Sequence, residues 1–144
     1  MSVRITREQL AETTRRLGRE ISAAYPEGVV LVAVLKGSVF FLADLIRCID
    51  VPCEVDFMAI SHFAPGSGRV RIIKDLDIPI DGRDVLVVED IVDTGLTLGY
   101  LLEQLRLRLP ASLEVCTLLD RTPSRILPLR LAFTGFAVDR EFLI

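Results

Sequence analysis

Residues 89–97, E-D-I-V-D-T-G-L-T, combine carboxylates, threonines and one glycine in a short run. Threonine hydroxyls, a glycine and the free amides of a helix N-terminus form an anion cradle that suits a phosphate. The adjacent carboxylates of Glu89 and Asp90 would repel a bare phosphate, so they indicate a ligand that also offers hydroxyls or arrives with a divalent cation. A sugar phosphate bound with magnesium meets both requirements.

The elements around this run place it at the edge of a buried sheet. Residues 85–88 are apolar without alternation, which predicts a strand covered on both faces that stops at the acidic pair. Apolar residues then recur with helical spacing, at positions 98, 101, 102, 105 and 109. The acids therefore fall at the carboxyl end of a strand and the threonines at a helix N-terminus, where open α/β sheets bind ligands.

A second anion site is predicted earlier in the chain. Residues 29–35 form another continuous apolar run, which leads into Lys36 and Gly37 before a helix rich in apolar residues. A lysine and a glycine between a strand and a helix N-terminus add a point charge to free backbone amides. Two such strand ends would meet at the same edge of one sheet.

The run V-V-E-D-I-V-D-T-G-L-T at residues 87–97 resembles the phosphoribosyl-diphosphate signature of the type I phosphoribosyltransferases, in the form found in hypoxanthine-guanine phosphoribosyltransferases. The resemblance covers nearly everything from residue 29 onward. It implies an α/β fold in which a mostly parallel twisted sheet is flanked by helices, with a mobile hairpin lid and a small hood. The phosphate motifs G-x-x-x-x-G-K-[ST] and G-x-G-x-x-G do not occur.

The resemblance implies purine salvage. The phosphoribosyl group of phosphoribosyl diphosphate would pass to N9 of a 6-oxopurine, hypoxanthine or guanine, giving IMP or GMP and diphosphate with Mg²⁺ as cofactor. Asp93 would be the catalytic base, and Glu89 and Asp90 would hold the ribose hydroxyls and the metal. The residues expected to bind substrates are Leu35, Lys36, Gly37, Glu89, Asp90, Asp93, Thr94, Gly95, Leu96, Thr97, Arg121, Arg125, Phe142 and Leu143.

These residues divide by the part of the substrate they would contact. Residues 93–97 would bind the 5′-phosphate, whereas residues 35–37 and Arg125 would contact the diphosphate. Phe142 would stack on the purine, and the backbone at Leu143 would read its edge. These purine contacts are implied by the resemblance alone.

The sequence departs from the family pattern at two places. The expected lid, residues 61–68, carries His62-Phe63 where the family has a Ser-Tyr pair. Arg121 stands where the family has a lysine that hydrogen-bonds the exocyclic oxygen of a 6-oxopurine. Arginine keeps the charge but replaces a point donor by a planar fork, so this difference is not neutral. The preference among hypoxanthine, guanine and xanthine is left open.

The remaining elements frame the site. Thr6 and Gln9 fit a capping box that opens an N-terminal helix. An edge strand is expected at residues 69–74, a further strand at 113–119 and a last one at 130–138. The resemblance stops before the glycine-tyrosine-rich stretch of the relatives, so we expect residues 1–144 to be one phosphoribosyltransferase domain lacking that C-terminal segment.

Composition excludes several classes of protein. A net charge of −3 and the absence of tryptophan argue against a nucleic-acid surface. No apolar run is long enough to span a bilayer and no secretory segment opens the chain, which predicts a cytoplasmic protein without a membrane partner. The 3 cysteines lack C-x-x-C spacing and are expected to be reduced thiols. The resemblance further implies a homodimer or homotetramer.

Two other readings remain open. A regulator that senses phosphoribosyl diphosphate or a nucleotide could keep the binding loop without turnover, and the missing C-terminal ligands favour it. A doubly wound signalling module would use an acidic pocket but has no use for D-T-G-x-T.

Overall fold

The computed structural model describes residues 4–61 and 70–142, which form one sheet with helices on both faces. The strand order is β3-β2-β1-β4-β5-β6, and all neighbours pair in parallel except β2 with β3. The elements are α1 (Arg7–Ala24), β1 (Val29–Val34), α2 (Ser38–Ile46), β2 (Cys53–Ile60), β3 (Ile72–Lys74), β4 (Asp84–Val92), α3 (Leu96–Arg106), β5 (Ser112–Asp120), the 3₁₀ turn η1 (Thr122–Ser124) and β6 (Phe133–Ala137).

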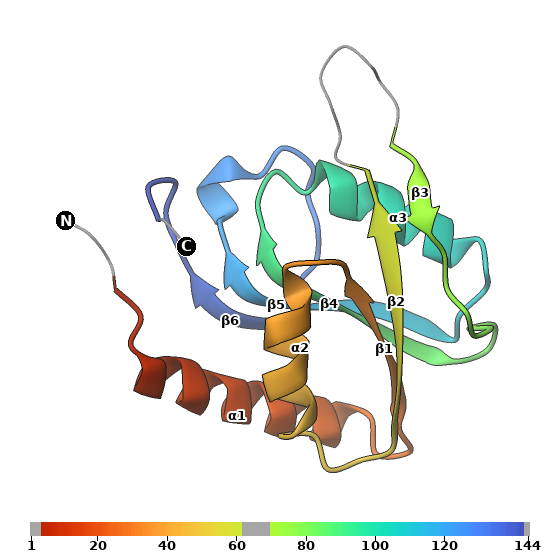
Figure 1. The fold of residues 1–144 in the computed structure, drawn as a ribbon, viewed down its shortest axis with the longest axis horizontal. Coiled ribbons are helices and arrows are strands. Elements are labelled where there is room, and N and C mark those ends of the chain that lie inside the picture. The colour runs from red at the N-terminus through yellow and green to blue at the C-terminus, as the bar shows by residue number, and fades with distance from the viewer. Residues whose placement is uncertain (1–3, 62–69, 143–144) are drawn as a thin grey trace.

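The sheet separates two apolar cores, with α2 in front of it and α3 behind it in Figure 1. On one face α3 packs over Val32 of β1 and Val87 of β4. On the other face α1 and α2 pack over the alternate residues, such as Leu31 and Leu86. Every residue of β1 and residues 85–88 of β4 are buried. The predicted strands covered on both faces are therefore confirmed.

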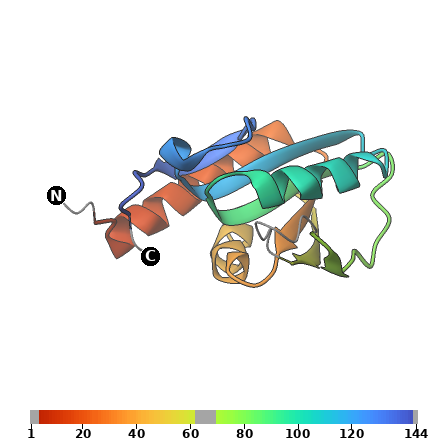
Figure 2. The ribbon, with the colours of Figure 1, turned by 90° about the horizontal axis from the view of Figure 1, so that it is seen from above.

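Parallel pairing brings the carboxyl ends of the central strands to one edge. Val30 of β1 lies opposite Val85 of β4, and Val92 of β4 lies opposite Asp120 of β5. In the view of Figure 2, β5 is seen along its length whereas β2 is strongly foreshortened, as expected for a twisted sheet. The segments that follow β1, β4 and β5 consequently converge on one region.

The structure corrects three expected boundaries. β4 continues through Glu89 and Asp90 to Val92, because β5 pairs with it as far as Asp120. α3 ends at Arg106, so Leu109 is not on its buried face; Leu109 has a φ of 56° and is 75% exposed. The last strand, Phe133–Ala137, is shorter than the expected 130–138.

The N-terminal helix begins as predicted. The Thr6 hydroxyl accepts a hydrogen bond from the Gln9 amide (3.1 Å), and the Gln9 side chain accepts one from the Thr6 amide (2.7 Å). The expected edge strand is present as β3, whereas lid residues 62–68, with His62 and Phe63, lie outside the described residues. Within the described ranges, no helix has the length and apolarity needed to cross a membrane.

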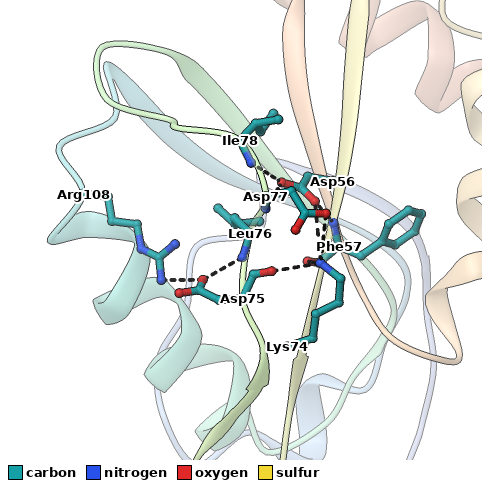
Figure 3. A network of polar contacts seen from close by, with 8 residues as sticks. All are labelled: Asp56, Phe57, Lys74, Asp75, Leu76, Asp77, Ile78 and Arg108. Carbon is teal, nitrogen blue, oxygen red and sulfur yellow. Dashed lines mark hydrogen bonds and ion pairs between the residues drawn. The ribbon is translucent and has the colours of Figure 1, made fainter.

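A buried carboxylate ties β2 to the segment that leads into β4 (Figure 3). Asp56 accepts hydrogen bonds from the amides of Asp77 (2.8 Å), Ile78 (3.0 Å) and Phe57 (2.8 Å). Burial by itself would raise the pKa of Asp56, but these amides and the nearby Lys74 ammonium outweigh it and lower the pKa below its ordinary value. Asp56 is therefore an ionised residue that anchors residues 77–78 to β2.

Replacing Asp56 by asparagine is expected to lower the free energy of unfolding by about 2 kcal/mol at neutral pH, because the new amide group leaves a buried N–H without an acceptor. The lowered pKa means that this stabilisation is present above the unfolded value of about 3.9 and is lost as pH falls through the folded value. Urea unfolding at neutral pH and near pH 3 should show the difference between the two proteins shrinking in acid.

Asp77→Asn is the matched control, because the Asp77 side chain is 79% exposed and lies 3.5 Å from the same Lys74 ammonium. An exposed pair of this kind contributes less than about 1 kcal/mol. Equal losses for the two variants would contradict the anchoring role of Asp56.

Candidate active site

A cavity of about 560 Å³ lies where β1, β2 and β4 end and where α2 and α3 begin. Open α/β sheets bind ligands at this edge, because strand ends and helix N-termini meet there. The lining residues are Val34, Leu35, Lys36, Gly37, Ile60, Glu89, Asp90, Ile91, Val92, Asp93, Thr94, Gly95, Thr97 and Leu98.

The two acids of β4 form the negative side of the cavity. Burial, with a further contribution from the charge of Asp90, raises the pKa of Glu89 to about 8. Asp90 accepts a hydrogen bond from the Ile91 amide at 2.8 Å. A raised carboxyl pKa means that the second negative charge is unfavourable here, so the pair favours a ligand that brings positive charge or hydroxyl donors.

The loop after β1 lies directly against this acidic pair. A Cβ atom added to Gly37 would lie 2.6 Å from Oδ2 of Asp90, closer than real contacts allow. Only glycine therefore permits this approach without moving the carboxylate. Gly37 also precedes α2 with no side chain capping the helix, and Lys36 beside it is exposed at the cavity. The loop thus offers amides and one ammonium opposite the acids.

The loop at residues 93–97, the threonine loop, forms the other wall of the cavity. Gly95 caps α3 in the left-handed conformation, with φ of 86°, and has no side chain to hydrogen-bond the helix end. The Thr94 hydroxyl accepts from the Leu96 amide at 3.3 Å. The first amides of α3 have no partner within the helix, so together with the hydroxyl of Thr97 they can bind an anion.

Asp93 is held by an arginine from the next strand connection. Nη1 of Arg121 lies 3.0 Å from Oδ2 of Asp93, and Nη2 of Arg121 donates to the carbonyl of Phe142 at 2.5 Å. The third nitrogen, Nε, is buried and has no hydrogen-bond partner among the described residues. One guanidinium therefore links the cavity to the C-terminal segment, residues 138–142, and leaves its Nε–H available.

Arg125 fixes the shape of the same connection. Its guanidinium is paired with the carboxylate of Asp120, and its Nε donates to the backbone carbonyl of Asp93 at 3.0 Å. Neither Arg125 nor Asp120 lines the cavity. The expected contact of Arg125 with diphosphate stays a prediction.

Leu127 seats the connection on α3. The amides of Ile126 and Leu127 donate to the Thr94 carbonyl at 2.9 and 3.1 Å. A Cβ atom added to Gly99 would lie 2.2 Å from Cδ2 of Leu127, so the leucine side chain rests on a helix position without a side chain. The threonine loop is thus held from behind by this contact.

The structure brings most of the predicted site residues together. Those on the cavity lining are Leu35, Lys36, Gly37, Glu89, Asp90, Asp93, Thr94, Gly95 and Thr97. Leu96 is in the first turn of α3 but does not line the cavity, and Arg121 and Phe142 connect to it through Asp93. Leu143 lies outside the described residues.

Two features of the site were not predicted from the sequence. Ile60 and Val34, the last residues of β2 and β1, form an apolar wall of the cavity, which the end of each apolar run could have indicated. The Arg121–Asp93 pair joins residues on either side of α3. Only the pairing of Val92 with Asp120 in β4 and β5 reveals it.

Comparisons with known proteins agree with this geometry. The sequence matches the phosphoribosyl transferase domain family over residues 5–143. It is 44% identical to a hypoxanthine-guanine phosphoribosyltransferase of Mycobacterium avium, with 99% of this chain and 75% of that protein covered, and 42% identical to the one of Bacillus subtilis, with 99% and 81% covered. A crystal structure of a hypoxanthine-guanine phosphoribosyltransferase from Bacillus anthracis superimposes with a TM-score of 0.91 at 40% identity, covering 99% of this chain and 84% of that one.

Proposed function

The chain belongs to the phosphoribosyltransferase family, and from this we infer that it is a purine salvage enzyme that acts as a hypoxanthine-guanine phosphoribosyltransferase. It transfers the phosphoribosyl group of phosphoribosyl diphosphate to a 6-oxopurine and releases diphosphate. The observation that carries this conclusion is the cavity itself. An acidic pair, a lysine-glycine loop and a threonine-lined helix N-terminus face one another within about 560 Å³. We take residues 1–144 to act as one domain.

We propose that the two ends of phosphoribosyl diphosphate bind at the two helix N-termini. The 5′-phosphate would lie on Thr94, Gly95 and Thr97, because the first amides of α3 and two hydroxyls converge there. The leaving diphosphate would lie on Lys36 and Gly37 at the start of α2. The ribose would then lie between them, with its hydroxyls against Glu89 and Asp90.

The acidic pair also fits a magnesium ion. Carboxylate oxygens are the ligands that Mg²⁺ prefers, and burial, together with the charge of Asp90, raises the pKa of Glu89, so a cation beside the pair would favour its ionised form. No group of three or more metal-binding side chains occurs in residues 4–61 and 70–142. Magnesium would therefore be held by Glu89, Asp90, substrate oxygens and water. When bound, it would offset the charge that develops on the leaving diphosphate.

The reaction breaks the bond between C1 of the ribose and a diphosphate oxygen and forms a bond from C1 to N9 of the purine. The proton leaves the imidazole edge of the purine, and we propose that Asp93 accepts it, because its carboxylate lines the cavity between the threonine loop and Arg121. The diphosphate departs with the electron pair of the broken bond. Positioning and charge stabilisation by the cavity supply most of the catalysis.

The purine would lie between Asp93 and the C-terminal segment. The buried Nε of Arg121 has no partner among the described residues, and the exocyclic oxygen of a 6-oxopurine is an acceptor that could satisfy it. Phe142, whose carbonyl Arg121 holds, would stack on the ring, and the backbone at Leu143 would read its edge. We also propose assembly as a homodimer or homotetramer, as family membership suggests.

A steady-state assay with hypoxanthine or guanine and phosphoribosyl diphosphate tests this function, together with calorimetric binding of phosphoribosyl diphosphate. We expect binding and the formation of IMP or GMP. The alternative of a non-catalytic sensor gains no support from relatives that are named as enzymes. Binding without product would nevertheless favour it, and neither binding nor product would refute both.

A further inference from the structure

Strand register places a cation beside the proposed proton acceptor. Val92 and Asp120 are opposite each other at the ends of β4 and β5, and the Arg121 amide donates to the Val92 carbonyl at 3.0 Å. The next residues along each strand, Asp93 and Arg121, are consequently neighbours, and their side chains form an ion pair at 3.0 Å. The pairing of the sheet thus sets this contact.

The Arg121 side chain can restrict the motion of Asp93 and of the Phe142 carbonyl. It is only 16% exposed, whereas the side chain of Asp93 is 49% exposed and would be free to rotate without a partner. The planar guanidinium spans Asp93 at one nitrogen and the Phe142 carbonyl at another. A fork of fixed geometry with two partners restricts both of them more than a single flexible ammonium can.

The segment carrying Phe142 is fastened in the opposite direction as well. Arg140, from the C-terminal segment, donates two hydrogen bonds to the Pro123 carbonyl, at 3.0 and 2.7 Å. Each segment therefore sends an arginine to a carbonyl of the other. Arg121 differs from Arg140 because its fork also reaches a residue of the cavity.

We propose that Arg121 is a positioning residue, an inference that rests on the proposed function. Its guanidinium orients the Asp93 carboxylate and at the same time holds the backbone of Phe142. The contact proposed between its Nε and the purine oxygen would affect purine binding, whereas at saturating purine Arg121 acts on the rate through Asp93. The contacts proposed for phosphoribosyl diphosphate, at residues 36–37 and 94–97, do not involve it.

Arg121→Lys tests this role, because lysine keeps the charge and cannot span both partners. Product release limits many enzymes, so the single-turnover rate is measured at saturating substrates. We expect this rate to fall about 30-fold, since a misplacement near 1 Å can cost about 100-fold. KM for phosphoribosyl diphosphate should stay within about twofold. Arg121→Gln, which keeps a donor for Phe142 but no charge for Asp93, should show a loss at least as large.

Combination with Asp93→Asn separates positioning from a general effect on the fold. If Arg121 acts through Asp93, adding Arg121→Lys to Asp93→Asn should lower the rate by no more than about twofold. The matched control is Arg16→Lys. Arg16 also bridges a carboxylate, Glu20 (2.7 Å), and a carbonyl, Thr134 (3.0 Å), but it lies on α1 away from the cavity. The control should keep the wild-type rate.

Several outcomes overturn the proposal. A wild-type rate for Arg121→Lys does so, as does an equal loss in the presence and absence of Asp93→Asn. A fall in melting temperature large enough to explain the lost rate of both Arg121 variants also overturns it. A wild-type protein that forms no nucleotide refutes the proposed function together with this inference, whereas an active wild type with an unaffected variant refutes the inference alone.

Discussion

Asp93→Asn is expected to lower the rate of nucleotide formation about 1,000-fold while KM for phosphoribosyl diphosphate stays within about threefold, in the range for loss of a general base. Asparagine keeps the size of the side chain and an oxygen for Arg121, but it cannot accept the purine proton. The proposed phosphate contacts are with the amides and hydroxyls of residues 94–97, so binding should persist. Single-turnover rates and calorimetric titration with phosphoribosyl diphosphate provide the two measurements.

Asp75→Asn is the matched control for this variant. The Asp75 side chain is 52% exposed and paired with Arg108 at 2.6 Å, much as Asp93 is 49% exposed and paired with Arg121. It lies on the segment between β3 and β4, where the Arg108 pair ties that segment to the end of α3 (Figure 3). Its loss should leave the rate unchanged. Turnover by Asp93→Asn at the rate of the control would remove Asp93 from the role of base.

Neutralising both acids of β4, by Glu89→Gln with Asp90→Asn, is expected to raise KM for phosphoribosyl diphosphate about 10- to 100-fold and to weaken the effect of Mg²⁺ on its binding. Both replacements keep the shape of the side chain but remove the charge that favours a divalent cation. Calorimetry of phosphoribosyl diphosphate with and without Mg²⁺ measures this effect independently of turnover.

The same double variant should be more stable than the wild type near pH 7. The pKa of Glu89 is about 8 in the folded protein and about 4.3 when unfolded. Ionisation of this carboxyl therefore favours the unfolded state, and the folded state loses stability as pH rises between these two pKa values. Glutamine does not ionise in either state, so it avoids the cost of keeping Glu89 protonated in the fold, and a higher melting temperature with weaker substrate binding is the expected combination.

Asp81→Asn with Asp84→Asn is the control for the acidic pair, because it removes two charges at and before the start of the same strand, outside the cavity lining. Its KM should match that of the wild type. A similar rise in KM for both double variants would mean that overall charge, and not the acidic pair, governs binding.

The sequence predicted the covered strands and the anion cradles for physical reasons that are local. A strand buried on both faces must be apolar throughout, as residues 29–34 and 85–88 are. A helix N-terminus preceded by glycine is likewise visible in a short run of letters, as at Gly37 and Gly95. The residues of the cavity lining therefore came almost entirely from two strand-to-helix junctions.

Features that depend on alignment between distant segments could not be predicted in this way. The extension of β4 through Glu89 and Asp90 depends on how far β5 pairs with it. The partners of Arg121 and Arg125 depend on the same alignment across α3, which pairs Arg121 with Asp93 and Arg125 with Asp120. Side-chain type identified these arginines, but only the register of the sheet assigns their partners.

Gly99 lies outside the cavity lining, yet its missing side chain bears on the threonine loop through Leu127. Any larger residue there would displace the end of the Leu127 side chain, on the segment whose Ile126 and Leu127 amides hold the Thr94 carbonyl. A mutagenesis survey confined to pocket-facing positions would therefore overlook a helix position that supports this loop from outside the pocket.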